Sequence, residues 1–438
     1  MKEIKLKGGL NIPLSGSVKK FTAEDLEPKF IGILSEDYFG LKPKFLLSEG
    51  DQVRVGQPII EDKTNQGFKI ISPVSGTICA VNRGEKRALI SVEIENDKKN
   101  TLFELNISGD IGEDLNNAGL WDSFRERPFD RVPNINSKPN YIFVNCCRKD
   151  SLELCPNLII SNENKFFNLG LDVLEKLTED TVFLCCNEEI ETASDNVEKF
   201  LISGKYPSGN SSAHINKICP IRKSKKTWTI SWQDVIRIGK YISTKSYCFE
   251  KYVSVTGSAC IEPKLFKTIS GASLTEITAG NASKESRLIS GSALYGTSGD
   301  SYTSYLLRHS DQVTIISDER KANLFNWLKL GEKDHSATNV FFSSISKPEN
   351  YDFDTNVNGG YRAIVPIGVF DEVNVFDIDP TLFLKSLAIG DLVALRELGI
   401  FDLIPEDMSV FSYVCPSKYD YVALFKDCIE DIWKEENS

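Results

Sequence analysis

Residue types that could carry chemistry are few in this sequence, and histidine is the first of them. The chain of 438 residues has three histidines, far apart in sequence and set among polar neighbours: His214, His309 and His335. A metal site or a Ser-His-Asp triad needs such side chains to converge with others in space. Their spacing has no signature of either kind, so the sequence predicts no metal site and no catalytic triad.

Eleven cysteines are the next candidates, and no two of them have the C-x-x-C spacing of metal or cluster ligands. Cys146-Cys147 and Cys185-Cys186 each close a short apolar run that is typical of a buried strand. Adjacent residues of a strand point to opposite faces, so neither pair can hold one ion by itself. An iron–sulfur cluster would need ligands scattered along the chain. We therefore expect the cysteines to act as small buried hydrophobic residues.

A glycine-rich element at residues 291–297 could cradle a phosphate. Gly291 and Gly296 have the spacing of the two P-loop glycines, but Thr297 stands where a P-loop has its lysine. No G-x-G-x-x-G follows the apolar run at residues 141–144 either. The sequence thus favours a turn or hairpin loop at 291–297 and predicts no nucleotide site.

One lysine, Lys63, has a setting that is similar to a swinging-arm attachment site. Residues 49–76 alternate glycine turns with apolar residues, as in a half-barrel of short strands, and they resemble the hammerhead of biotinyl and lipoyl carrier domains. Those carriers present their lysine on a two-residue hairpin. Here residues 64–71 separate Lys63 from Ser72-Pro73, which makes the loop wider. The sequence favours a barrel kept as a scaffold with an unmodified lysine, and a lipoyl-type carrier is the lesser alternative.

The elements that must position such residues change in type along the chain. A strand from residue 141, a helix over 166–177 and a strand over 181–186 form a strand–helix–strand unit, which implies parallel pairing. This unit predicts an α/β domain over about residues 101–255. The apolar positions that follow predict a further helix. They are Ile190, Val197, Phe200 and Leu201.

The remaining sequence predicts a β-rich module and then helices. Residues 253–317 alternate short apolar runs with small residues, notably Gly257-Ser258-Ala259 and Ser290-Gly291-Ser292. Such segments leave the backbone open to a ligand or another chain. Helices are expected after them, the first following the Asp379-Pro380 cap. The expected helices cover residues 381–388, 392–398 and 419–434.

Composition restricts the partners of the chain. Its 51 basic and 62 acidic residues give a net charge of −11 and a pI near 5.1. This balance disfavours nucleic acid and anionic lipid as partners bound through phosphates. No run approaches the roughly 18 apolar residues of a membrane span, and the first residues lack the apolar core of a signal peptide. We therefore expect a cytosolic protein without a transmembrane segment.

Several short motifs in a fixed order are more specific together than any one of them. They are Lys7-Gly8-Gly9-Leu10, Glu49-Gly50-Asp51, Gly170-Leu171-Asp172-Val173-Leu174, Gln233-Asp234-Val235-Ile236, Thr278-Ala279-Gly280, Pro366-Ile367-Gly368 and Val414-Cys415-Pro416-Ser417-Lys418-Tyr419. Through them the chain resembles the NqrA family, which supplies one subunit of the sodium-translocating NADH:quinone reductases, bacterial respiratory membrane complexes. A related family, the cytoplasmic C subunit of the complex that couples ferredoxin to NAD, has cysteine-rich cluster motifs that this chain lacks.

The resemblance implies an α/β multidomain fold similar to that of the flavin-binding subunit of the proton-pumping NADH dehydrogenase. Four regions are expected, and their functional labels follow from the resemblance. They are a biotinyl/lipoyl-like barrel-sandwich region over 1–100, a Rossmann-like α/β domain without a nucleotide fingerprint over 101–255, a soluble-ligand-binding β-grasp-like module over 256–335 and a mostly helical C-terminal domain over 336–438.

The resemblance also implies a function. The complex oxidises NADH, reduces ubiquinone to ubiquinol and exports Na⁺, and this chain would be a peripheral subunit on the cytoplasmic face of the inner membrane. Its partners would be the other subunits of the complex, including integral membrane subunits, together with the quinone substrate. Flavins and an iron–sulfur centre would belong to those partners, so this chain would hold no redox cofactor and would not be active by itself.

No catalytic residue is evident from the sequence, and the candidates for a quinone-proximal site lie in the barrel region. They are Tyr38, Phe39, Gly40 and Lys42. An aromatic ring can stack on a quinone headgroup, and a glycine admits close approach. The competing interpretation of these residues is an ordinary surface turn. The competing function is a structural scaffold that binds partner subunits and never contacts quinone.

Overall fold

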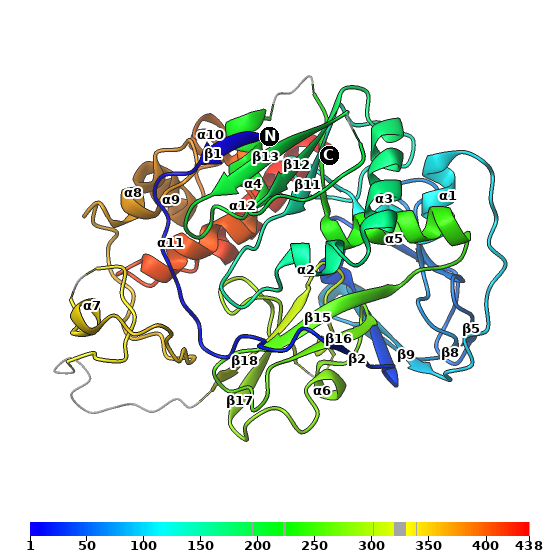
Figure 1. The fold of residues 1–438 in the computed structure, drawn as a ribbon, viewed down its shortest axis with the longest axis horizontal. Coiled ribbons are helices and arrows are strands. Elements are labelled where there is room, and N and C mark those ends of the chain that lie inside the picture. The colour runs from blue at the N-terminus through cyan, green and yellow to red at the C-terminus, as the bar shows by residue number, and fades with distance from the viewer. Residues whose placement is uncertain (195, 222–224, 301, 319–329, 339, 438) are drawn as a thin grey trace.

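A computed structural model describes residues 1–194, 196–221, 225–300, 302–318, 330–338 and 340–437. Four β-sheets and several groups of helices make up these described residues (Figure 1). Strands come first in the sequence, strands and helices are mixed in the middle, and helices come last, so the fold is the α/β multidomain type that the sequence predicts. Within the described ranges, no helix is long and apolar enough to cross a membrane.

A six-stranded sheet forms the centre of the molecule. Its order is β1-β13-β12-β11-β14-β10, and its strands pair in parallel except β10. The strands are β1 (Lys2–Lys5), β10 (Arg125–Glu126), β11 (Tyr141–Cys146), β12 (Thr181–Cys186), β13 (Val197–Ser203) and β14 (Thr227–Ser231).

The predicted strands that begin at residues 141 and 181 and the predicted parallel pairing are therefore confirmed. The predicted helix through Val197 and Phe200 is wrong, because this segment is strand β13. Its three- and four-residue apolar spacing also fits a strand in which Val197, Phe200 and Ile202 are buried. Pairing with both β12 and β1 decided the outcome, since sheet contacts override a weak local pattern.

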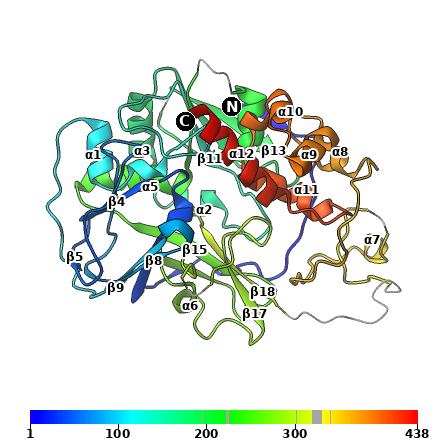
Figure 2. The ribbon, with the colours of Figure 1, turned by 180° about the vertical axis from the view of Figure 1, so that it is seen from behind.

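Helices cover the six-stranded sheet on both faces (Figures 1 and 2). One face packs against α3 (Asn164–Leu177) and α5 (Trp232–Thr244), which cross so closely that glycines stand at the crossing. A Cβ on Gly170 would lie 2.1 Å from the Val235 carbonyl oxygen, and one on Gly239 would lie 1.8 Å from that of Phe166. No larger residue fits there without moving a helix.

The other face presents Phe143, Phe183 and Phe200 to the C-terminal helices. Strands β11 and β12 thus alternate between two buried faces, as expected for a parallel sheet covered on both sides. The three helices predicted near the C-terminal end are confirmed as α9, α10 and α12. The C-terminal elements are α7 (Ser343–Ser346), α8 (Val369–Val373), α9 (Pro380–Ile389), α10 (Leu392–Glu397), η5 (Ile400–Asp402), η6 (Pro405–Met408), α11 (Ser409–Val414) and α12 (Tyr421–Asn437).

The predicted β-rich module is a five-stranded sheet with the order β17-β18-β15-β16-β2. Strand β2 comes from the N-terminal part of the chain and β1 joins the central sheet, so residues 1–25 tie two sheets together. The elements of this sheet are β2 (Ala23–Asp25), β15 (Glu250–Thr256), β16 (Lys264–Ile269), α6 (Leu274–Ile277), β17 (Ser286–Ser290) and β18 (Gln312–Ser317).

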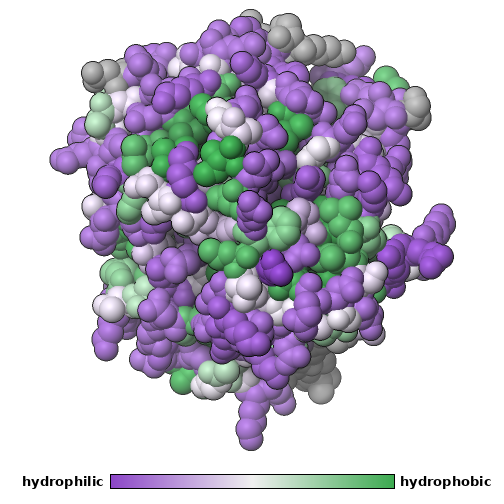
Figure 3. Space-filling model, turned by 90° about the vertical axis from the view of Figure 1, so that its right-hand side faces the viewer, coloured by the Kyte–Doolittle hydropathy of each residue, from purple (hydrophilic) through white to green (hydrophobic). Residues whose placement is uncertain are grey.

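Two small antiparallel sheets, β3-β9-β8-β5 and β4-β6-β7, build the N-terminal barrel. Hydrophobic residues appear in separate patches among hydrophilic ones on the face that carries these strands (Figure 3). The elements are β3 (Phe30–Leu34), η1 (Ser35–Asp37), β4 (Pro43–Phe45), β5 (Gln52–Val53), β6 (Pro58–Asp62), β7 (Lys69–Ile71), β8 (Gly76–Arg83), η2 (Glu85–Arg87) and β9 (Leu89–Asn96).

The hairpin between β6 and β7 carries the lysine that resembles a swinging-arm site. Glu61 pairs with Lys69, so a wide loop connects the strands, as the sequence predicts. Lys63 is exposed in that loop.

The linking elements are α1 (Ile111–Asn117), η3 (Trp121–Ser123), α2 (Pro156–Ile160) and α4 (Ser211–Ile218).

Candidate functional site

In the central sheet, the strands that follow β11 in sequence lie first on one side of it and then on the other. From β11 the chain moves to β12 and β13 on one side, and it later returns to place β14 on the other side. Neighbouring parallel strands whose connections diverge leave a crevice beyond their carboxyl ends, where ligands bind in many α/β proteins. Asn145 near the end of β11 and Ser231 at the end of β14 lie at this crevice.

A cleft of about 810 Å³ opens at this position. Its walls come from the barrel, the α/β domain, the β-rich sheet and the C-terminal helices, so no single part of the chain forms it. Among the residues that line it are Asp37, Tyr38, Phe39, Gly40, Arg125, Asn145, Lys149, Glu153, Ser231, Trp232, Ser290, Gly291, Ser292, Tyr295, His309, Asp311, Glu406, Phe425, Lys426 and Trp433.

Aromatic side chains hold the barrel against helix α12 at one wall. The rings of Phe39 and Trp433 meet edge to face with centroids 5.8 Å apart, and the Arg131 guanidinium lies 4.5 Å from the Trp433 ring centroid. An ion pair of 3.3 Å between Lys426 and Glu36 adds to this contact. This wall therefore combines aromatic rings with charged side chains that hold the barrel and α12 together.

Three of the four predicted quinone-proximal residues line the cleft. They are Tyr38, Phe39 and Gly40. Tyr38 is buried and its hydroxyl donates to Asp122 over 3.0 Å, so its ring is fixed in place. Lys42 is not among the lining residues: its side chain is exposed, and its backbone N–H donates to Asp62 beside the β6–β7 hairpin.

Two carboxyl groups in the cleft have raised pKa values. Burial raises the pKa of Asp37 to about 7, against the lowering effect of Arg125 and of the Arg308 N–H that donates to it. Burial likewise raises the pKa of Glu153 to about 8, although the nearby Lys149 charge works in the opposite direction. Near neutral pH, a large fraction of each side chain is therefore an uncharged acid.

The three histidines stay apart, as the sequence predicts. His214 is buried in α4, where Nε2 lies 2.9 Å from the Ser208 carbonyl oxygen and burial lowers the pKa to about 4. His335 contacts Tyr413 in the C-terminal region. His309 lines the cleft, where its side chain is exposed. No group of three or more potential metal ligands occurs among the described residues.

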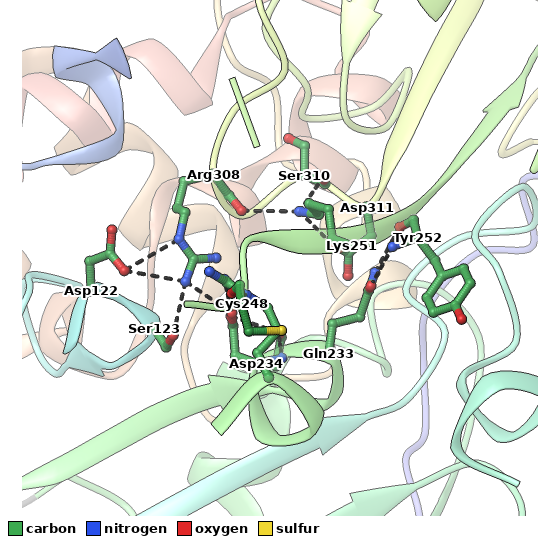
Figure 4. Close-up of polar contacts among 12 residues, drawn as sticks. Asp122, Ser123, Gln233, Asp234, Cys248, Lys251, Tyr252, Arg308, Ser310 and Asp311 are labelled. Atoms are coloured by element: carbon green, nitrogen blue, oxygen red, sulfur yellow. Dashed lines mark hydrogen bonds and ion pairs between the residues drawn. The ribbon is translucent and has the colours of Figure 1, made fainter. Parts of the chain in front are cut away.

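A buried ion network fixes the cleft-lining loop that contains His309 (Figure 4). Arg308, next in the chain, binds Asp234 at 2.9 Å and Asp122 at 3.2 Å. Lys251 of β15 donates to the Arg308 and Ser310 carbonyl oxygens and pairs with Asp311 at 2.8 Å. The β-rich sheet is thereby locked onto η3 and α5 of the α/β domain.

Small residues predicted to leave the backbone open also reach the cleft. Ser290, Gly291 and Ser292 line it, as does Tyr295 from the same segment. Segment 291–297 is an irregular loop that returns to β17 through hydrogen bonds between Ser290 and Thr297. No helix begins behind its glycines in the described structure before strand β18, so a P-loop is excluded by geometry as well as by the missing lysine.

The cysteines are mostly packed in the core, as the sequence predicts. Cys146 and Cys147 are buried at the end of β11, and Cys185 and Cys186 are buried in β12. Burial raises the pKa of each of these thiols, so they stay protonated and unreactive. Cys415 and Cys428 are buried as well, whereas Cys79 is exposed on β8. The other four are partly exposed: Cys155, Cys219, Cys248 and Cys260.

Known proteins with related sequences match this chain over nearly its whole length. Family models match in three segments: an NqrA N-terminal barrel-sandwich hybrid domain over residues 4–97, an NqrA second alpha/beta domain over 108–247, and an NQRA C-terminal domain over 252–300. NqrA proteins of Na(+)-translocating NADH-quinone reductase are 36% identical over 444 residues in Marinomonas sp. (98% of this chain and 99% of the relative) and over 445 residues in Saccharophagus degradans (99% and 100%). The one in Vibrio vulnificus is 36% identical over 444 residues (99% and 100%). The chain belongs to the NqrA family.

The family that the sequence motifs predict is therefore confirmed. Membership of the NqrA family also establishes that the chain is one subunit of a multi-subunit reductase, so other subunits are its partners. The barrel-sandwich and α/β parts of the fold agree with the descriptions of the family models.

Sequence reasoning missed most of the polar residues of the cleft in this NqrA-family protein. Among them are Asp37, Arg125, Lys149, Glu153 and Glu406. One signal could have revealed two of them, because Lys149 and Glu153 follow directly after the predicted strand β11, where ligand-binding residues of parallel sheets gather. The others come from segments distant in sequence and had no local signature.

Proposed function

We propose that this chain forms the site at which the reductase reduces quinone. The observation that carries the proposal is the cleft of about 810 Å³, which has an aromatic wall on one side and proton-holding carboxyl groups on another. A quinone has the matching character, with a flat headgroup that accepts hydrogen bonds and an apolar tail. Pockets of this size with few convergent polar groups are typical of small-molecule sites.

The rest of the proposal places the chain in the complex. It is a peripheral subunit on the cytoplasmic face of the bacterial inner membrane, and it contacts integral subunits through protein surfaces. Its net charge of −11 supports this, since anionic lipid would repel it. Electrons from NADH reach ubiquinone through flavins and an iron–sulfur centre on partner subunits, and Na⁺ is exported by the assembled complex. This chain carries no redox cofactor in the proposal, and the absent glycine fingerprint supports that assignment.

The Phe39→Ala variant of the assembled complex tests the quinone site. Loss of an aromatic contact worth about 0.5–1.5 kcal/mol predicts a rise of roughly 2- to 10-fold in the KM for quinone. Phe21→Ala is the matched control, because Phe21 is half exposed and does not line the cleft. Unchanged quinone affinity and turnover in Phe39→Ala would contradict the proposal.

A structural scaffold is the second candidate, and exposed apolar side chains favour it. Leu330, Ile345 and Tyr361 are 80%, 73% and 81% exposed in a part of the chain with little regular structure. Exposed apolar side chains that form one contiguous patch are typical of surfaces that other proteins cover. Quinone titration of the purified chain separates the candidates: saturable binding near one equivalent supports the quinone site, whereas no binding supports the scaffold.

A further inference from the structure

We propose that Glu153 donates a proton to a quinone oxygen when quinone is reduced in the cleft. This inference rests on the proposed function and adds a catalytic residue to it. The assignment starts from the position of Glu153, which lines the cleft just beyond the carboxyl end of β11. Its side chain is partly exposed there, so a ligand in the cleft can reach the carboxyl group.

The loop that carries Glu153 is held rigidly. The Asp150 carboxylate accepts hydrogen bonds from the N–H groups of Leu152 at 2.8 Å and Glu153 at 3.0 Å. The Ser151 hydroxyl donates to the Ile12 carbonyl oxygen over 3.1 Å and accepts the Leu14 N–H at 3.0 Å. The N-terminal segment therefore braces the loop, and the carboxyl group needs little reorganisation to meet a ligand.

The cation nearest to Glu153 is engaged elsewhere. The Lys149 ammonium group pairs with Glu406 at 3.0 Å and lies 5.6 Å from the Tyr295 ring centroid. The Glu153 carboxyl accepts a hydrogen bond from the Lys149 backbone N–H, and no lysine or arginine of the described chain forms an ion pair with it. A carboxyl group that lacks a paired cation in an enclosed site retains its proton.

Groups on every surrounding element act on the proton of Glu153. Asp150 in its own loop and Asp311 before β18 both raise its pKa, and Lys149 lowers it. Glu406 on η6 and Tyr295 after β17 complete the ring of titratable neighbours in the cleft. With burial as the largest cause, the pKa is about 8, so most Glu153 side chains are protonated at pH 7.

The proton transfer balances within the reaction of the complex. Quinone takes two electrons, which NADH supplies through the partner subunits, and two protons. The Glu153 O–H bond breaks as one quinone oxygen gains its proton, and cleft water supplies the proton for the other oxygen. Lys149 stabilises the carboxylate that is left, and water then returns a proton to it. A general acid of this kind contributes about 10²- to 10⁴-fold to a rate.

The test uses the assembled complex with Glu153→Gln, Glu153→Asp and, as a control, Glu397→Gln, whose carboxyl group is exposed on α10. We expect kcat for quinone reduction to fall at least roughly 100-fold in Glu153→Gln with KM changed by less than about twofold. We expect the activity of the parent to decline above pH 8 as Glu153 loses its proton, and this decline should be absent in Glu153→Gln. Glu153→Asp should keep part of the rate, Glu397→Gln should match the parent, and NADH oxidation by a one-electron acceptor that needs no proton should stay unchanged in all three.

The outcomes distinguish this inference from the function on which it rests. A photoreactive quinone that labels the cleft, combined with unchanged turnover and pH profile in Glu153→Gln, would overturn the proton donor and leave the quinone site standing. A fall in kcat that keeps the decline above pH 8 would also overturn it, because a purely positional role predicts that result. Labelling outside the cleft would refute the proposed function together with this inference.

Discussion

Replacing Arg308 with methionine should destabilise the chain strongly, because Arg308 joins two domains through buried charges. The Arg308 and Asp234 side chains are 9% and 4% exposed and meet at 2.9 Å, while Asp122 is 13% exposed and lies 3.2 Å from the guanidinium. Methionine keeps most of the apolar stem and removes the charge. Breaking a buried pair by deleting one partner costs about 3–5 kcal/mol.

The structure places the expected loss near the lower end of that range. Asp234 keeps a second cation, since Arg237 pairs with it at 2.8 Å. Asp122 keeps the hydrogen bond from the Tyr38 hydroxyl but loses its cation. We therefore expect a decrease of about 3 kcal/mol in the free energy of unfolding, of which Asp122→Asn in the same chain should restore about 1 kcal/mol or more.

Equilibrium unfolding in urea measures this change. Tryptophan fluorescence is a suitable probe, because Trp121 precedes Asp122 and its ring lies 5.5 Å from that of Trp228, centroid to centroid. Lys2→Met is the control, since the exposed pair of Lys2 with Glu198 should contribute less than about 1 kcal/mol. A loss below about 1 kcal/mol in Arg308→Met would refute the argument that the buried network locks the domains together.

The same network predicts how the difference in the free energy of unfolding between the parent and Arg308→Met depends on pH. Burial opposes ionisation of Asp234, but Arg308 and Arg237 overcome it and hold the carboxyl pKa far below its usual range. A depressed pKa in the folded state adds stability that is complete above the unfolded value, near 3.9, and that is lost progressively as pH falls from that value toward the lower pKa of the folded state. The gap between parent and Arg308→Met should thus be full at pH 7 and narrow below about pH 4.

Three further predictions concern other parts of the chain. Gly239→Ala should lower the free energy of unfolding, measured by urea titration, by about 1–3 kcal/mol, because its Cβ would lie 1.8 Å from the Phe166 carbonyl oxygen. The control Gly360→Ala has open space around the new Cβ, so its free energy of unfolding should change little. Intact mass spectrometry should show no adduct on Lys63, since its loop is wider than a carrier hairpin; a lipoyl or biotinyl mass increase would contradict this. Glu153→Gln should have a higher free energy of unfolding than the parent above pH 8 and an equal one near pH 4. A raised carboxyl pKa in the folded state costs stability as pH rises from the unfolded value to about 8. A constant difference in the free energy of unfolding across that range would contradict this prediction.

Much of the central fold could be predicted because its segments carry strong local patterns. Strands β11 and β12 are mostly apolar and helix α3 has a continuous buried stripe, so the local sequence of each predicts its structure. Strand β13 did not, since an apolar spacing of three and four residues is typical of a helix, and in the strand it places Val197 on one buried face of the sheet and Phe200 on the other. Its identity came from hydrogen bonds to β12 and β1, and β1 lies almost two hundred residues away.

The candidate site divides in the same way. Sequence by itself determined the family, the α/β character, the acidic charge and the absence of a nucleotide fingerprint, because each depends on residue order or residue count. Only the tertiary structure decided which side chains share the cleft: Phe39 meets Trp433 from the far end of the chain, the exposed Lys42 side chain does not line it, and Glu153 lies among groups from four segments. Burial and the charges of distant neighbours set the protonation of such a group, and neither quantity is written in the local sequence.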